Sequence, residues 1–122
     1  MATNQQADAF VTLAVAQGLI RNGFVIETEM RLPSGFRPDL FAYTAKLNFI
    51  IEIKIAEDEN AVPKIMTVAS KQLAKEKDYK SFIVIGIRNS AYIFLPDELR
   101  KKMSFTRSDF IAKRLPSVVQ PN

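Results

Sequence analysis

Residues 37–55 read RPDLFAYTAKLNFIIEIKI, and this stretch decides the fold. It contains two apolar runs, Asp39 to Tyr43 and Phe49 to Ile55, joined by a short connection. Runs of this length, rich in β-branched and aromatic residues, predict the two strands of a hairpin. A two- or four-residue connection centred between residues 45 and 46 would place Asp39 directly opposite Glu52, with Cβ atoms about 5 Å apart.

The second of these strands carries two charges on one face. Side chains alternate along a strand, so Glu52 and Lys54 share a face while Ile51, Ile53 and Ile55 point into a core on the other. An ion cluster on a wet sheet face would explain the charges without any function. We favour a functional reading, because charges in so apolar a strand are costly unless something compensates them.

The opposed carboxylates and the lysine together suggest a reaction. Asp39 and Glu52 would repel each other unless a cation joined them. The Lys54 ammonium could orient a water molecule, stabilise negative charge on a phosphate, or act as a base. A metal ion, two carboxylates and a lysine fit the hydrolysis of a phosphodiester.

Composition narrows the choice of metal and class of protein. The 122 residues include no histidine and no cysteine, so a metal would be held by oxygen ligands, which favours Mg²⁺, Mn²⁺ or Ca²⁺. The same absence excludes disulfides and a cysteine nucleophile. We expect a cytoplasmic protein, since no segment is apolar enough to span a membrane and the polar N-terminus does not resemble a signal peptide. The net charge of +4 suits a polyanionic partner, although solubility alone would explain it.

The surrounding sequence predicts one domain over residues 1–115 and a flexible tail over 116–122. We expect a helix from Gln5 to Arg21 with an apolar stripe at Phe10, Leu13, Ala14, Gln17, Leu19 and Ile20. A second helix from Pro63 to Lys77 has its predicted stripe at Ile65, Val68, Ala69 and Leu73. The remaining expected elements are strands at Phe24 to Leu32, Ser81 to Ile87 and Ala91 to Leu95, a short helix opening at Pro96, and a helix from Ser108 to Arg114.

This order predicts an α/β fold with a mixed sheet of about five strands flanked by helices, in the sequence α-β-β-β-α-β-β-α. Three meander strands followed by a crossover helix favour that class.

The motif Arg37-Pro38-Asp39 with Glu52-Ile53-Lys54 resembles the PD-(D/E)xK nuclease superfamily, whose restriction-endonuclease-like fold has the same order of elements. Within that superfamily the chain is most similar to the archaeal Holliday-junction resolvases. The resemblance implies a DNA endonuclease that depends on Mg²⁺ (or Mn²⁺), acts as a homodimer and cuts branched DNA. It implies that Asp39, Glu52 and the carbonyl of Ile53 bind the metal and that Lys54 is catalytic.

The chain departs from that pattern in its first helix. The resolvases usually place a glutamate there, facing the metal, whereas this helix carries only Asp8. Asp8 either substitutes for the glutamate or the role is absent.

Several further residues are candidates for catalysis or DNA contact, and most of them also have a non-functional interpretation. Gln72 is a catalytic candidate because many superfamily members have a polar residue there, and an ordinary helix glutamine is an equal alternative. Ser34 and Arg37 flank the motif and suit contact with a DNA backbone, and Lys71 and Lys75 suit the same contact or simple solubility. Two rival functions stay open: an inactive nucleic-acid-binding module and a protein-interaction module. We expect no membrane partner and no small-molecule cofactor.

Overall fold

The fold was obtained as a computed structural model, which describes residues 4–88, 90, 92–104 and 111–114. These residues form, in chain order, α1 (Asn4–Arg21), β1 (Val25–Glu27), β2 (Leu40–Tyr43), β3 (Asn48–Ala56), the 3-10 turn η1 (Glu59–Ala61), α2 (Val62–Leu73), β4 (Lys80–Ile87), β5 (Tyr92–Leu95), α3 (Asp97–Arg100) and β6 (Ile111–Arg114).

The strands form one mixed sheet in which spatial order follows chain order from β1 to β6. The meander β1–β2–β3 is antiparallel, α2 crosses over to bring β4 parallel to β3, and β5 returns antiparallel to β4. The predicted α/β class with a helix-flanked mixed sheet is therefore confirmed. The described part of the sheet has six strands rather than about five.

The register predicted for the central hairpin is also confirmed. Leu40 pairs with Ile51 and Tyr43 pairs with Asn48, which leaves the four residues 44–47 as the connection. The Thr44 N–H donates to the Leu47 carbonyl at 2.8 Å, and the Thr44 hydroxyl accepts from the N–H groups of Lys46 and Leu47. Because the Thr44 hydroxyl accepts from N–H groups within the turn, the turn is stabilised without a glycine.

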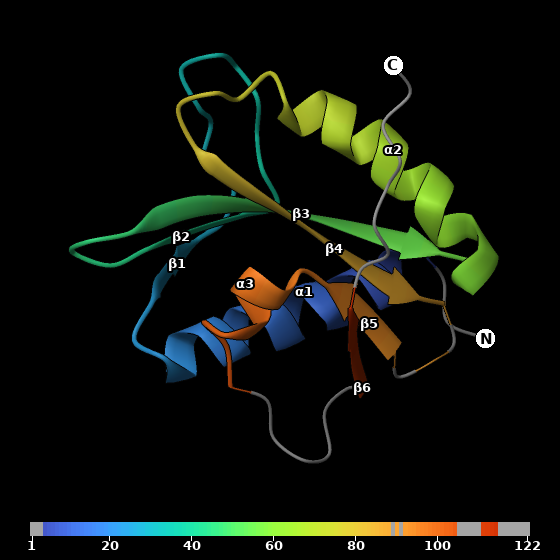
Figure 1. Cartoon of the computed structure of the whole chain (residues 1–122). Helices are drawn as coiled ribbons and strands as arrows, with labels where there is room; N and C mark the ends of the chain where they lie inside the picture. The colour runs from blue at the N-terminus through green and yellow to red at the C-terminus, as the bar shows by residue number, and fades with distance from the viewer. Residues whose placement is uncertain (1–3, 89, 91, 105–110, 115–122) are drawn as a thin grey trace.

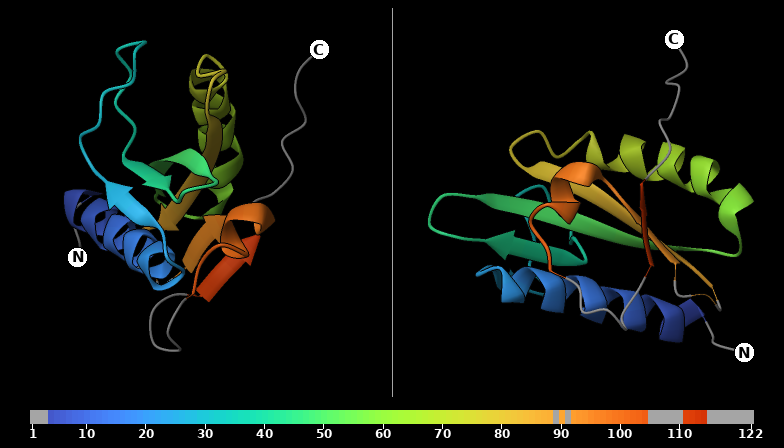
Figure 2. Two further views of the ribbon diagram at one scale, coloured as in Figure 1. Left: turned by 90° about the vertical axis from the view of Figure 1, so that its left-hand side faces the viewer. Right: turned by 60° about the horizontal axis from the view of Figure 1, so that its bottom comes forward.

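The two long helices cover opposite faces of the sheet (Figures 1 and 2). On one face α1 contributes Val15 and Leu19 to a core that contains Ile51 and Ile53. On the other face, the core residues from α2 pack against Ile50. The predicted alternation along β3 therefore holds, with its odd-numbered residues facing α1.

The predicted first strand is too long. It stops at Glu27, because Glu29 adopts a left-handed conformation (φ 59°) that a strand cannot continue through. Leu32, 2% exposed, instead turns back onto the core that lies under α2. Residues 28–39 thus form a loop that leads directly into Asp39.

Two helix predictions are wrong at the C-terminal side. The helix expected to run to Lys77 ends at Leu73. Of the helix expected from Ser108 to Arg114, residues 108–110 lie outside the described part of the chain, and Ile111–Arg114 form β6, parallel to β5. Pairing with the free edge of β5 satisfies backbone groups on both strands, which outweighs local helix preference. The predicted tail also lies outside the described residues, so the domain boundary at 115 stays a prediction.

The predicted helix stripes need correction as well. In α1 the core side chains are Val11, Ala14, Val15 and Leu19, while Phe10, Leu13 and Ile20 are 66%, 56% and 55% exposed. In α2 the buried residues are Val62, Met66, Ala69 and Leu73, and Val68 is 62% exposed. A helix that is apolar on every side does not reveal its buried face by pattern alone. Neither α1 nor another helix of the described residues is long and apolar enough to cross a membrane.

Candidate active site

Asp39 and Glu52 meet where β2 begins, and crossed hydrogen bonds tie them together. The backbone N–H of Asp39 donates to Glu52 Oε1 at 3.2 Å, and the backbone N–H of Ile53 donates to Asp39 Oδ2 at 2.7 Å. Each strand's acidic side chain is therefore held by the main chain of the other strand. Both carboxylates keep a fixed direction without needing a neighbouring side chain to orient them.

Pro38 has no backbone N–H group to donate to the carbonyl of Ile53 on β3. Continuing the hairpin register by two residues from Leu40 and Ile51 would place Pro38 opposite Ile53. In an antiparallel ladder a residue's N–H and C=O face the same neighbouring strand. The Ile53 N–H reaches Asp39, so its carbonyl faces the same edge, where Pro38 has no N–H to donate. The Ile53 carbonyl oxygen is thus expected on the same side of β3 as Asp39.

Lys54 is the third member of the cluster. Its Nζ lies 3.4 Å from Glu52 Oε2, and 35% of its side chain is exposed, against 7% for Glu52. The ammonium therefore reaches solvent while the carboxylate beneath it does not. Burial raises the pKa of Glu52, the charge of Asp39 raises it further, and Lys54 offsets part of this rise.

The charges of Asp39 and Lys54 also act on Asp8, which lies on α1. Partial burial raises the pKa of Asp8, and the charge of Asp39 adds to the rise. The charge of Lys54 and a 3.2 Å hydrogen bond from the Thr12 hydroxyl act the other way. The sequence left open whether Asp8 has a role, and gave no reason to single out Thr12. A threonine four residues after an acid on a helix is the signal that would have identified the pair.

These side chains have an unbalanced formal charge. Asp8, Asp39 and Glu52 carry three negative charges when ionised, and Lys54 carries one positive charge, which leaves −2. A divalent cation would balance that charge, and the donors are the oxygens that Mg²⁺ and Mn²⁺ prefer. Within the described residues, no three acidic side chains are close enough together to hold a metal by themselves. Mg²⁺ commonly binds through one or two carboxylates and retains water, so Asp39, Glu52 and the Ile53 carbonyl fit it.

The remaining predicted residues are all exposed. Gln72 is exposed on α2 and, among the described residues, forms no hydrogen bond or ion pair with Asp39, Glu52 or Lys54. The predicted DNA-contacting residues Ser34, Arg37, Lys71 and Lys75 are all exposed. The Ser34 hydroxyl donates to Glu76 Oε1 at 2.7 Å, which ties the loop before Asp39 to the segment after α2.

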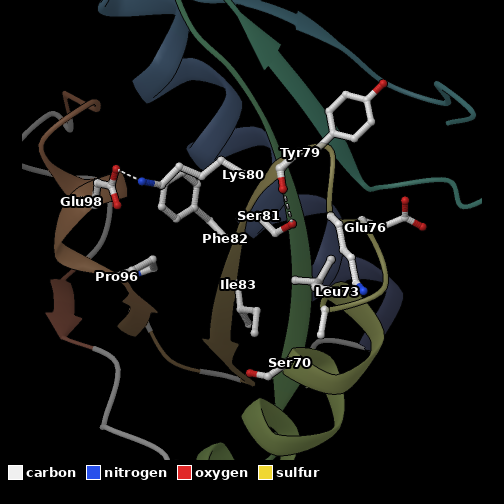
Figure 3. A pocket seen from close by; sticks show the side chains of 12 residues that line it. Ser70, Leu73, Glu76, Tyr79, Lys80, Ser81, Phe82, Ile83, Pro96 and Glu98 are labelled. Atoms are coloured by element: carbon white, nitrogen blue, oxygen red, sulfur yellow. Dashed lines mark hydrogen bonds and ion pairs between the residues drawn. The ribbon is translucent and has the colours of Figure 1, made fainter.

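A groove lies between the end of α2, the start of β4 and α3 (Figure 3). Its floor includes Leu73 and Ile83, and Lys80 forms an ion pair with Glu98 at its rim. The hydrogen bond from Lys80 lowers the pKa of the exposed Glu98. None of the four predicted catalytic residues is among the described residues that line the groove, although Ile83, which does line it, is the β4 register partner of Glu52.

Comparison with known proteins gives a likeness among solved structures and none among protein families. No family model matches the chain, and no curated protein matches it. Among solved structures, the chain is similar to Hjc of Archaeoglobus fulgidus, a Holliday junction resolvase from an archaeal hyperthermophile. The two are 18% identical over 64% of this chain and 67% of that chain, with a TM-score of 0.36. The functional proposal therefore depends on the geometry around Asp39 and Glu52.

Proposed function

We propose that this protein is an endonuclease that hydrolyses DNA phosphodiester bonds and depends on Mg²⁺ or Mn²⁺. The observation that supports the proposal is the crossed hydrogen bonding of Asp39 and Glu52 beside Lys54. A structural ion cluster would place equal and opposite charges together. Here two carboxylates, one of them buried, are held beside a single lysine, and the charges of Asp39 and Lys54 also act on Asp8.

Each residue then has a distinct role. Asp39, Glu52 and the Ile53 carbonyl hold the cation, which supplies an activated water and neutralises charge on the phosphate. The Lys54 ammonium, partly exposed beside Glu52, lies where it can orient that water or stabilise charge on the phosphate. Asp8 contributes a further carboxylate to the same cluster, and Thr12 orients it.

DNA contact is proposed for the exposed cations and hydroxyl around the site. Arg37 lies two residues before Asp39, and Lys71 and Lys75 lie on and just after α2. Such side chains bind phosphates without reading sequence, which makes the affinity fall as salt rises. Cutting both strands of a duplex or junction calls for two catalytic sites, and we propose that two copies supply them. Gln72 stays a catalytic candidate of lower rank, because its side chain is exposed on α2.

The test is cleavage of supercoiled plasmid, linear duplex and four-way junction DNA by the purified chain with Mg²⁺ or Mn²⁺. We expect nicking or cutting that EDTA abolishes and that Glu52→Gln abolishes. Glu98→Gln is the matched control, because Glu98 is an exposed carboxylate paired with a lysine on another part of the surface. Its activity should equal that of the unmodified protein.

The rival functions give different results in the same assay. Cleavage that survives both EDTA and Glu52→Gln would reject the metal mechanism. Salt-dependent DNA binding without cleavage would indicate an inactive binding module, and no DNA affinity would indicate a protein-interaction module.

A further inference from the structure

The groove between α2, β4 and α3 has an apolar floor. Leu73 and Ile83 form this floor, Pro96 lies at the side where β5 ends, and the volume is about 550 Å³ (Figure 3). Binding sites in proteins commonly measure about 300–1,000 Å³ and have mainly apolar linings with a few polar groups. The groove therefore has the size and the lining of a docking surface.

The end of β6 lies beside this groove. β6 runs parallel to β5, and Leu95 pairs with Arg114. Pro96 follows Leu95 with an extended backbone (φ −68°, ψ 147°), so continuing the register by one residue would place residue 115 beside Pro96. Pro96 itself lines the groove. The chain that leaves β6 therefore starts at the edge of the groove.

Residues 115–122 read LPSVVQPN and differ in composition from the chain before them. Leucine and valine are frequent here and no residue is charged, whereas half of residues 97–114 are charged. A segment that remains in solvent usually has many charges and few aliphatic residues. Pro116 and Pro121 restrict the backbone, which lowers the entropy that docking costs. The tail predicted over residues 116–122 therefore has the composition of a docking segment.

We infer that residues 115–119 dock in the groove of the same molecule and cover its floor. Neighbouring strands lie about 4.8 Å apart, so β4 is about 10 Å from β6 across β5. An extended chain advances about 3.3 Å per residue, so three residues beyond position 115 reach Ile83. Val118 is that third residue. Val118 and Val119 then supply the aliphatic side chains that cover Leu73 and Ile83.

A nucleic acid is the other occupant that the rim suggests, because Lys77 and Lys80 line the groove. Its phosphates would compete with Glu98 for Lys80, and they would approach the carboxylate of Glu76, which also lines the groove. Bringing like charges together is unfavourable. An uncharged segment of the same chain avoids both costs and is already attached at the edge of the groove.

The chain contains no cysteine, so pairs of introduced cysteines can report which segments are close without any background reaction. Ser70→Cys on the wall of the groove is combined with Ser117→Cys. The matched control combines Val68→Cys with Ser117→Cys, because Val68 is 62% exposed and lies two residues earlier on α2, about 200° around the helix. With a short thiol-specific cross-linker and about 1 μM protein, the first pair should cross-link within one molecule at least about tenfold faster than the control.

Further variants test the apolar contact. Val118→Asp together with Val119→Asp, added to the first cysteine pair, should slow its cross-linking at least about fivefold, because a carboxylate on the apolar floor is unfavourable. Gln120→Asp together with Asn122→Asp adds the same charge at polar positions. This control should change the rate less than about twofold. The measurement needs neither DNA nor metal, so its outcome is independent of the nuclease proposal.

Three results would overturn the inference. Equal rates for the two cysteine pairs would show that the segment does not favour the groove. Cross-links found only between molecules would mean that the groove holds the segment of a second copy. Protection of Ser70→Cys from a thiol reagent only when DNA is added would make nucleic acid the occupant. Circular dichroism checks that each variant folds, and Ala74→Cys, which is exposed and lines the groove, replaces Ser70→Cys if that variant does not fold.

Discussion

The two faces of β3 differ in composition and in what they contact. Toward α1 the strand presents Ile51, Ile53 and Ile55, which pack in an unbroken apolar cluster. Toward α2 it presents Ile50, then the buried Glu52 and the half-exposed Lys54. The comparison teaches that alternation along one nine-residue strand places Glu52 and Lys54 together on the α2 face, between the core residues Ile50 and Ala56, and leaves the α1 face entirely apolar. Substitutions of the isoleucines on the α1 face should therefore change stability, and substitutions of Glu52 and Lys54 should change activity.

The largest expected effect is on activity at Lys54. Lys54→Met keeps most of the length and packing of the side chain and removes the charge beside Glu52. We expect DNA cleavage to fall at least about 100-fold, because a charge acting on the transition state is lost. The melting temperature should fall only slightly, because the core is untouched and Glu52 loses one compensating charge. Initial rates of plasmid nicking measure the cleavage activity, and differential scanning fluorimetry measures the melting temperature. A large loss of stability with normal activity would contradict the separation of the two faces.

Ile51→Ala tests the opposite face. Ile51 is fully buried one residue before Glu52, and its truncation should lower the free energy of unfolding by about 3 kcal/mol. The rate of cleavage per folded molecule should be nearly unchanged, since the carboxylates are held by main-chain groups. Urea unfolding measures the free energy of unfolding. Cleavage rates divided by the concentration of folded protein measure the activity per folded molecule. If this variant keeps its stability and loses its activity, the two faces are not independent.

Metal binding should stabilise the protein through the charged face. Mg²⁺ at about 100 times its dissociation constant should raise the free energy of unfolding by about 2.7 kcal/mol. Asp39→Asn should remove this gain, whereas Ile51→Ala and Glu98→Gln should retain it. Melting temperatures recorded across a Mg²⁺ titration would show the difference. An equal gain in Asp39→Asn would mean that the cation binds elsewhere.

The smallest expected effect is a gain in stability from Glu52→Gln without metal. The pKa of Glu52 is raised by burial, so the folded protein holds its proton more tightly than the unfolded chain does. Stability therefore falls as pH rises from the ordinary value of 4.5 through the raised pKa. Glu52→Gln removes this fall, so the variant should be more stable near pH 7 by about 1 kcal/mol and equal to the unmodified protein at low pH. Urea unfolding in EDTA at several pH values measures this difference in the free energy of unfolding. A Glu52→Gln variant that is less stable than the unmodified protein near pH 7 would contradict the prediction.

The hairpin and its site were predictable because they depend on local rules. Alternation along β3 and the length of one turn were enough to oppose Asp39 and Glu52. What the sequence did not reveal depends on contacts between distant segments. The end of β1 follows from the left-handed Glu29 and the docking of Leu32, β6 follows from the free edge of β5, and the buried side of the uniformly apolar α1 follows from the shape of the sheet. The charges of Asp39 and Lys54 also act on Asp8, which lies on α1, and no spacing within the hairpin could show this.

The exchange of main-chain hydrogen bonds between Asp39 and Glu52 also has a consequence for the life of the protein. Before β2 and β3 close, neither acid has the peptide N–H group that aims it, because that group belongs to the other strand. A nascent or partly unfolded chain consequently holds only scattered acids with no shared direction. If the protein cuts DNA, that ability arises in a single step with the closing of one hairpin, and incompletely folded copies are harmless to the genome of the cell that makes them.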